Sequence, residues 1–199
     1  MKQLKVIVSG GGTGGHIFPA IAIVKLLEKK VSNIDVLFVG AKEKMEMIKI
    51  PSEGYNIEGL WISGLQRRIT TDNLSFPFKL ISSLLKARKI IKRFKPDIAI
   101  GTGGYASGPL LYMAAKLEVP TIIQEQNSYP GITNKILSRT VDKVCVAYDN
   151  MERFFPKEKI VFTGNPIRED ILELETKYQQ GISHFKLNEN KKTVLVIGG

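Results

Sequence analysis

The first twenty residues constrain the fold more than any other stretch, because they place a glycine-rich loop between a strand and a helix. Lys5–Val8 is a short apolar run that predicts a buried strand, and from Ile17 to Lys30 apolar residues recur at helical spacing. The intervening segment, Gly10–His16, holds five glycines. Backbone N–H groups at such a helix start favour an anion, and glycine lets the backbone approach it closely. The segment therefore predicts a cradle for phosphate or pyrophosphate.

Two details of this loop narrow the kind of ligand. The spacing Gly10-x-Gly12-x-x-Gly15 matches the dinucleotide fingerprint, but an NAD-type site also needs an acid at the end of the second strand. Here the nearest acid, Glu43, lies beyond that position. His16 stands at the loop–helix junction, where an imidazole can meet both a phosphate and an attacking hydroxyl. The alternative is that His16 only caps or packs the helix.

Composition excludes several classes of protein. The 199 residues are 43% hydrophobic and 24% charged, which is ordinary for a soluble globular protein. Cys145 is the single cysteine, so an internal disulfide is impossible, and its apolar surroundings predict a buried core residue. The two histidines, His16 and His184, are far apart, so we expect no zinc site. No stretch reaches the roughly 20 apolar residues of a membrane span.

Apolar runs rich in β-branched residues alternate with helical patterns along the chain, which predicts an α/β fold with a Rossmann-like, doubly wound parallel sheet. Ligands bind beyond the carboxyl ends of such strands, so the glycine-rich loops after the first and fourth strands should face one crevice. The predicted strands are Lys5–Val8, Asp35–Val39, Asn56–Ile62, Ile98–Ile100, Thr121–Gln124, Val144–Ala147 and Ile160–Thr163. The predicted helices are Gly15–Lys30, Glu43–Ile48, Asn73–Phe94, Gly108–Leu117 and Gly131–Ser138, with a helical connector at Arg168–Gln180 and an exposed loop at Gly181–Lys192.

The net charge of +10 is concentrated in one segment, since nine basic residues and one acid fall between Gly64 and Lys95. Nucleic acid, anionic lipid or solubility could each explain such a patch. The long helix within it has two apolar stripes at about 100° per residue. One is the expected core face: Phe76, Leu80, Leu84, Ala87, Ile91 and Phe94. The other is Leu74, Phe78, Ile81 and Leu85, continued by Arg88, Lys89 and Lys92, and is either covered by a neighbouring segment or exposed for a membrane surface.

Several motifs in one order resemble the MurG family of bacterial GT-B glycosyltransferases, and the resemblance covers the whole chain. Its motifs are Gly11–His16 with Pro19, Ile62–Leu65, Lys95–Asp97 leading into the second glycine loop Gly101–Pro109, Glu125–Asn127 with Gly131, Thr133, Asn134 and Lys135, and Gly164–Arg168. The resemblance implies the N-terminal domain of a two-domain protein whose second domain is missing here. We expect an acceptor and membrane-docking domain over residues 1–165, a connector over 166–192, and at 193–199 the first strand of a truncated donor-binding domain. We expect the chain alone to be inactive.

The resemblance implies inverting transfer of GlcNAc from UDP-GlcNAc to the C4 hydroxyl of lipid I, the undecaprenyl-pyrophosphoryl-MurNAc-pentapeptide, to give lipid II. A direct displacement needs a general base, for which His16 is the first candidate and Glu125 the second; the alternative for Glu125 is a carboxylate that holds loops. The residues expected to bind the nucleotide sugar are Thr13, Gly14, Gly15, Asn127 and Arg168. Expected to bind the acceptor pyrophosphate are Gly12, Gly103, Gly104, Tyr105, Ser107 and Asn134.

The resemblance also favours the membrane explanation of the basic helix, with Leu74, Phe78, Ile81, Leu85 and Lys89 docking on an anionic surface at the cytoplasmic face of the bacterial inner membrane. We expect no nucleic-acid partner, metal or cofactor. Two alternatives stay open. The chain could be the non-catalytic, membrane-docking acceptor subunit of a split glycosyltransferase. It could also be a Rossmann oxidoreductase, although the missing acid after the second strand argues against that class.

Overall fold

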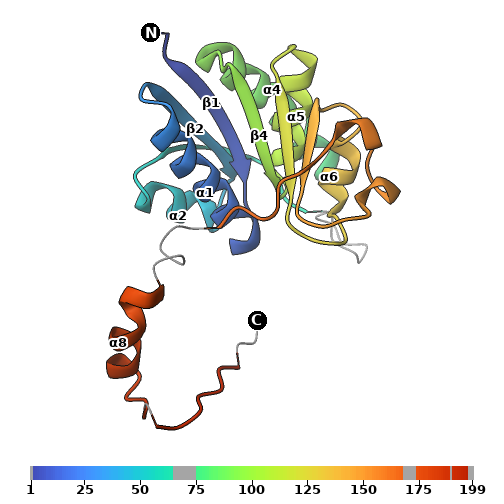
Figure 1. Cartoon of the computed structure of the whole chain (residues 1–199). Helices are drawn as coiled ribbons and strands as arrows, with labels where there is room; N and C mark the ends of the chain where they lie inside the picture. The colour runs from blue at the N-terminus through green and yellow to red at the C-terminus, as the bar shows by residue number, and fades with distance from the viewer. Residues whose placement is uncertain (1, 65–74, 168–173, 189, 197–199) are drawn as a thin grey trace. The chain divides into compact units, whose positions relative to one another are not determined.

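A computed structural model describes residues 2–64, 75–167, 174–188 and 190–196 of the chain. The chain divides into two compact units, Met1–Pro166 and Ile167–Gly199. Figure 1 traces both. Within the described ranges, no helix is long and apolar enough to cross a membrane.

The first unit is built on a seven-stranded parallel sheet with strand order β3-β2-β1-β4-β5-β6-β7. The order reverses direction between β1 and β4, so a topological switch point lies between these two strands (Figure 1). The strands are β1 (Leu4–Gly10), β2 (Ile34–Ala41), β3 (Asn56–Leu60), β4 (Ile98–Gly103), β5 (Thr121–Glu125), β6 (Lys143–Val146) and β7 (Ile160–Phe162). All seven predicted strands are confirmed, and most of them are short runs rich in β-branched residues, as is usual for buried parallel strands.

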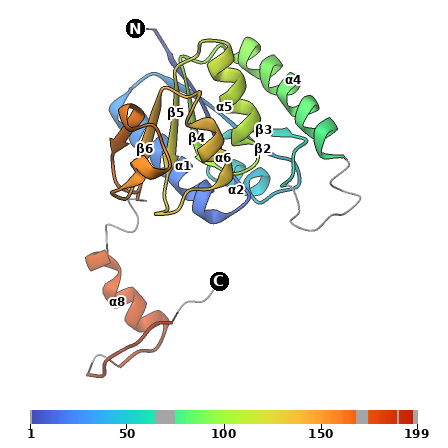
Figure 2. The same ribbon diagram turned by 90° about the vertical axis from the view of Figure 1, so that its right-hand side faces the viewer.

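Helices cover both faces of the sheet. One face carries α1 and α2, and Figure 2 shows α4, α5 and α6 together on the other. Strand β1 serves both faces, since Val6 and Val8 pack with α1 while Ile7 packs with α4 and α5. The helices are α1 (Gly14–Lys30), α2 (Glu46–Ser52), α4 (Phe76–Phe94), α5 (Ser107–Lys116) and α6 (Ile132–Leu137), with 3-10 turns η1 (Met151–Arg153) and η2 (Lys157–Lys159).

Several helix boundaries differ from the prediction, and the structure shows a reason for two of the differences, at the start of α2 and at the end of α8. The helix after β2 begins at Glu46 rather than Glu43, because Glu43 adopts a left-handed conformation (φ 62°) that no α-helix contains. In the second unit, α8 (Leu174–His184) continues through Gly181, where an exposed loop was expected. The Phe185 N–H donates to the Gly181 carbonyl at 3.0 Å and so extends the helical bonding past the glycine. A strand was predicted over residues 193–199, and the described part of it, 193–196, has no regular secondary structure.

Candidate functional site

The two glycine loops meet at the carboxyl ends of β1 and β4, the neighbouring strands at the switch point. The Gly11 N–H donates to the Gly103 carbonyl at 3.3 Å. The α-carbon of Gly104 lies so close to Gly11 that an added Cβ would stand 2.3 Å from the Gly11 carbonyl oxygen. Gly103 (φ 109°) and Gly104 (φ 90°) also occupy backbone conformations that L side chains rarely adopt. Glycine is therefore required in the second loop for both reasons.

His16 lies between the two loops, in the first turn of α1. This helix starts after an extended Thr13, whose carbonyl accepts the His16 and Ile17 N–H groups at 3.1 and 3.2 Å. The His16 Nδ1 lies 3.0 Å from the Gly11 carbonyl oxygen. Because a carbonyl only accepts, this contact assigns the proton to Nδ1 and leaves a lone pair on Nε2. A Cβ at Gly103 would lie 2.8 Å from Nε2, so that edge of the ring borders the second loop.

Glu46, at the start of α2, is a site residue that the sequence analysis missed. Its side chain is 1% exposed, and its carboxylate accepts the Gly12 N–H through Oε2 and the Ala41 N–H through Oε1, both at 2.9 Å. The carboxylate thus ties the first glycine loop to the end of β2. A single acid in a short helical pattern gives no signal in the sequence that its side chain will be buried. The only indication of a special role was its position near the start of a helix, where a negative charge is favourable.

Glu125, the second candidate base, is buried at the end of β5 and holds a loop. Its Oε1 accepts the Asn127 N–H and Nδ2, both at 3.0 Å, and its Oε2 accepts the Gly131 N–H at 3.3 Å and the Asn134 Nδ2 at 2.9 Å. With four donors and 2% exposure, the carboxylate has the environment of a structural group. This geometry favours the loop-holding alternative over the role of base.

The other predicted ligand-binding residues divide by exposure. Ser107 and Asn134 are buried beneath the loops, where the Ser107 hydroxyl donates to the Ser9 carbonyl at 3.3 Å and Asn134 serves Glu125. Their side chains therefore support the loops rather than line an open site. The accessible ones are Gly12, Thr13, Gly14, Gly15, Gly104, Tyr105 and Asn127, whereas Gly103 is buried and Arg168 lies outside the described residues.

The second apolar stripe of α4 is exposed. Phe78, Ile81 and Leu85 are 69%, 57% and 63% exposed, and Lys89 beside them is exposed too. Leu74 lies outside the described residues. The opposite face of α4 is the core face, with Ala87 and Ile91 among its buried residues, joined by Ile90 and Ser83 and by the partly buried Phe76, Leu80 and Phe94. Among the described residues, therefore, no neighbouring segment covers the stripe.

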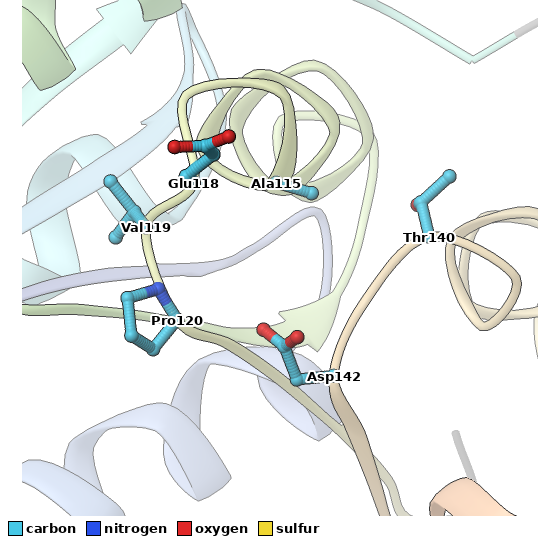
Figure 3. A pocket seen from close by; sticks show the side chains of 6 residues that line it. All are labelled: Ala115, Glu118, Val119, Pro120, Thr140 and Asp142. Carbon is cyan, nitrogen blue, oxygen red and sulfur yellow. The ribbon is translucent and has the colours of Figure 1, made fainter.

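A cavity of about 340 Å³ lies at the opposite end of the strands from the glycine loops (Figure 3). It borders the amino end of β5, since Pro120 precedes the first residue of that strand. The Asp142 carboxylate in its wall accepts the Thr121 N–H and hydroxyl at 2.7 and 2.8 Å, and these bonds lower the pKa of Asp142. The cavity is thus remote from the glycine loops. Its lining is Ala115, Glu118, Val119, Pro120, Thr140 and Asp142.

Metal-ligating side chains do not gather anywhere in the part of the chain that the structure describes. Cys145 is a free cysteine of intermediate exposure on β6, and burial raises the pKa of its thiol. Cys145 was predicted to be a buried core residue, and it is only partly buried.

Solved structures with this fold define its class. A crystal structure of Acinetobacter baumannii MurG aligns with a TM-score of 0.70 and 32% identity, over 85% of this chain and 49% of that one. UDP-GlcNAc 2-epimerase from Neisseria meningitidis shares the fold at a TM-score of 0.65 with 15% identity, over 95% of this chain and 56% of that one. The parallel sheet with paired glycine loops at its switch point is thus the N-terminal domain of the GT-B class of glycosyltransferases.

The model of the glycosyltransferase family 28 N-terminal domain matches residues 6–146, and the chain belongs to this family. Similar proteins bear the name UDP-N-acetylglucosamine--N-acetylmuramyl-(pentapeptide) pyrophosphoryl-undecaprenol N-acetylglucosamine transferase. The one from Flavobacterium psychrophilum is 58% identical over 100% of this chain and 54% of its own length. The one from Cytophaga hutchinsonii is 56% identical over 100% and 54%. The chain therefore spans about half the length of the curated relatives it matches.

Proposed function

We propose that this chain is the acceptor-side half of an inverting glycosyltransferase that moves GlcNAc from UDP-GlcNAc to the C4 hydroxyl of undecaprenyl-pyrophosphoryl-MurNAc-pentapeptide. The observation that carries the proposal is the meeting of the two glycine loops beside His16, whose Nδ1 is 3.0 Å from the Gly11 carbonyl. Loop backbones suit a pyrophosphate, and the acceptor carries one. The names of the relatives supply the donor and acceptor.

In this proposal His16 is the general base. The acceptor oxygen attacks C1 of GlcNAc, the bond from C1 to UDP breaks with inversion, and the hydroxyl proton passes to Nε2 of His16. Glu125 holds the 126–131 loop instead, because taking a proton would cost it bonds from Asn127, Gly131 and Asn134.

The backbones of Gly12 and Gly104, with Tyr105, receive the acceptor pyrophosphate, whereas the buried Gly103 supports the second loop without touching it. Thr13, Gly14, Gly15 and Asn127 reach the nucleotide sugar, together with Arg168. Departure of UDP is assisted by helix dipoles and cationic side chains, with no metal or cofactor required.

We further propose that the exposed face of α4 docks on an anionic membrane at the cytoplasmic side. Phe78, Ile81 and Leu85 supply apolar area and Lys89 supplies charge. This placement brings the glycine loops to a lipid-linked acceptor. Liposome binding by variants with glutamate in the apolar stripe tests this docking.

The transfer reaction itself tests the main proposal. Since the relatives are about twice as long, the enzyme to assay is a chimera of this chain followed by the C-terminal half of the Flavobacterium psychrophilum relative. We expect it to transfer labelled GlcNAc to a lipid I analogue, and the 199-residue chain alone to transfer none. A chimera that folds and binds UDP-GlcNAc but transfers nothing would refute the proposal. Turnover by the chain alone would refute the need for a second domain.

A further inference from the structure

The Gly11–Gly12 peptide is bonded from both sides by side chains from different helices. Its carbonyl oxygen lies 3.0 Å from Nδ1 of His16, and its N–H donates to Oε2 of Glu46 at 2.9 Å. The carbonyl and N–H of one trans peptide point in opposite directions, so the unit connects the imidazole to the carboxylate in one line of hydrogen bonds.

The surroundings make this arrangement specific for a carboxylate. Gly11 and Gly40 flank Glu46 so closely that a Cβ at Gly11 would stand 2.2 Å from Oε1, and one at Gly40 would stand 2.5 Å from Cγ. The second oxygen accepts the Ala41 N–H at 2.9 Å. Glutamine cannot replace both bonds, because its NH₂ group would face one of the two N–H donors. Burying a carboxylate at 1% exposure is costly unless hydrogen bonds compensate, so these two bonds are needed.

We propose that Glu46 is a positioning residue for His16 and acts through the Gly11–Gly12 peptide. A negative carboxylate on the N–H polarises the peptide, which makes its carbonyl a stronger acceptor for the Nδ1 proton. The proton thereby stays on Nδ1 and the lone pair on Nε2, the atom that borders Gly103. When Nε2 takes the acceptor proton, the imidazolium charge is stabilised from one peptide away, and no proton moves to Glu46.

The tautomer of His16 tests this directly, without any enzyme activity. Nitrogen NMR of the 199-residue chain at about pH 8.5, where an ordinary imidazole is neutral, reports which ring nitrogen carries the proton. With two histidines in the sequence, a His184→Gln background assigns the His16 signals. We expect the Nδ1–H tautomer to dominate, and Glu46→Gln to shift the tautomer ratio toward Nε2–H by about threefold or more.

The matched control is Glu53→Gln, which removes an equal charge from the other end of α2. There the carboxylate pairs with Lys25 and Lys49, both at 2.7 Å, and not with the loop. The Glu53→Gln substitution should leave the tautomer ratio of His16 unchanged. An unchanged ratio in a folded Glu46→Gln chain would overturn the proposal. If that variant does not fold, the scalar coupling across the Gly12 N–H to Glu46 bond in the unsubstituted chain decides instead: its detection supports the proposal and its absence overturns it.

Kinetics separate positioning from a general structural role. The kinetic experiment rests on the proposed function and uses the chimera. We expect Glu46→Gln to lower kcat by about tenfold or more, with the KM for UDP-GlcNAc within about twofold. In a His16→Ala background the same substitution should have almost no further effect, because both act through one group. Equal losses in the two backgrounds would overturn the proposal. No transfer by the unsubstituted chimera would instead count against the proposed function and leave the tautomer result intact.

Discussion

The Nε2 edge of the His16 ring lies against the α-carbon of Gly103, and a Cβ on that carbon would stand 2.8 Å from Nε2. The second glycine loop therefore sets where the proposed base can sit. The contact joins α1 to the end of β4, two segments that are far apart in the sequence.

Gly103→Ala should lower kcat in the chimera by about tenfold or more, because the methyl group displaces the imidazole and a misplaced catalytic group loses much of its effect. The substitution also forces a side chain into a left-handed φ of 109°, at a cost of about 1–2 kcal/mol in stability. Initial rates of GlcNAc transfer and a urea titration measure the two effects.

The control for this variant is Gly108→Ala in the same loop region. Gly108 lies in α5, and its added Cβ would meet only the Thr133 methyl group at 3.6 Å, an ordinary contact. Its activity should stay within about twofold of the parent, as expected for a site without strain. Equal losses in both variants would show that the contact with His16 is not what matters.

Glu125→Ala should destabilise the 199-residue chain by about 2–4 kcal/mol, because it leaves buried donors without their acceptor. The donors include the Asn127 and Gly131 N–H groups and the Asn134 amide. Urea unfolding followed by circular dichroism measures the change. Glu152→Ala, at an exposed position in η1, is the matched control and should change stability by less than about 0.5 kcal/mol. A loss for Glu125→Ala no larger than that of its control would contradict the loop-holding role.

Phe78→Glu combined with Leu85→Glu should abolish binding to anionic liposomes without unfolding the chain, because both side chains are exposed. Each apolar side chain gains about 1.5–3 kcal/mol when fully removed from water, and each nearby cation adds about 1 kcal/mol at an anionic surface. Binding by co-sedimentation should therefore need anionic lipid and weaken with added salt.

Leu26→Glu combined with Ile48→Glu is the matched control for the stripe. Both residues are exposed apolar side chains, 50% and 78%, on the helices that cover the other face of the sheet. This pair should leave liposome binding unchanged. Retained binding by the Phe78 and Leu85 variant, or unfolding of it, would contradict the docking proposal.

The fold was predictable because its signals are local. Most of the strands are short runs of apolar residues, and the helix α4 repeats its core positions at helical spacing. Ligand-binding loops gather at the switch point of such a sheet, and this rule predicts that the carboxyl ends of β1 and β4 are adjacent. The family motifs show where the two glycine loops lie in the sequence, but they do not show that the loops contact each other.

The side chains that support the glycine loops were not predictable, because their roles depend on contacts between distant segments. Glu46 and Gly12 are separated by helix α1, strand β2 and the loops that flank them, and nothing in the spacing marks their bond. Ser107 belongs to a predicted ligand loop, yet its hydroxyl turns inward to the Ser9 carbonyl. Which side of a loop a polar side chain faces is decided by the buried backbone groups that need partners.

The most direct test of the account is kcat for GlcNAc transfer by the chimera with His16 replaced by alanine. A lost general base usually costs about 10²–10⁴ in rate, and we expect a loss in that range with the KM for the acceptor nearly unchanged. The fold should persist, because His16 is only half-buried at the loop–helix junction. A loss of less than about tenfold would contradict the role of His16 as base and return Glu125 to consideration.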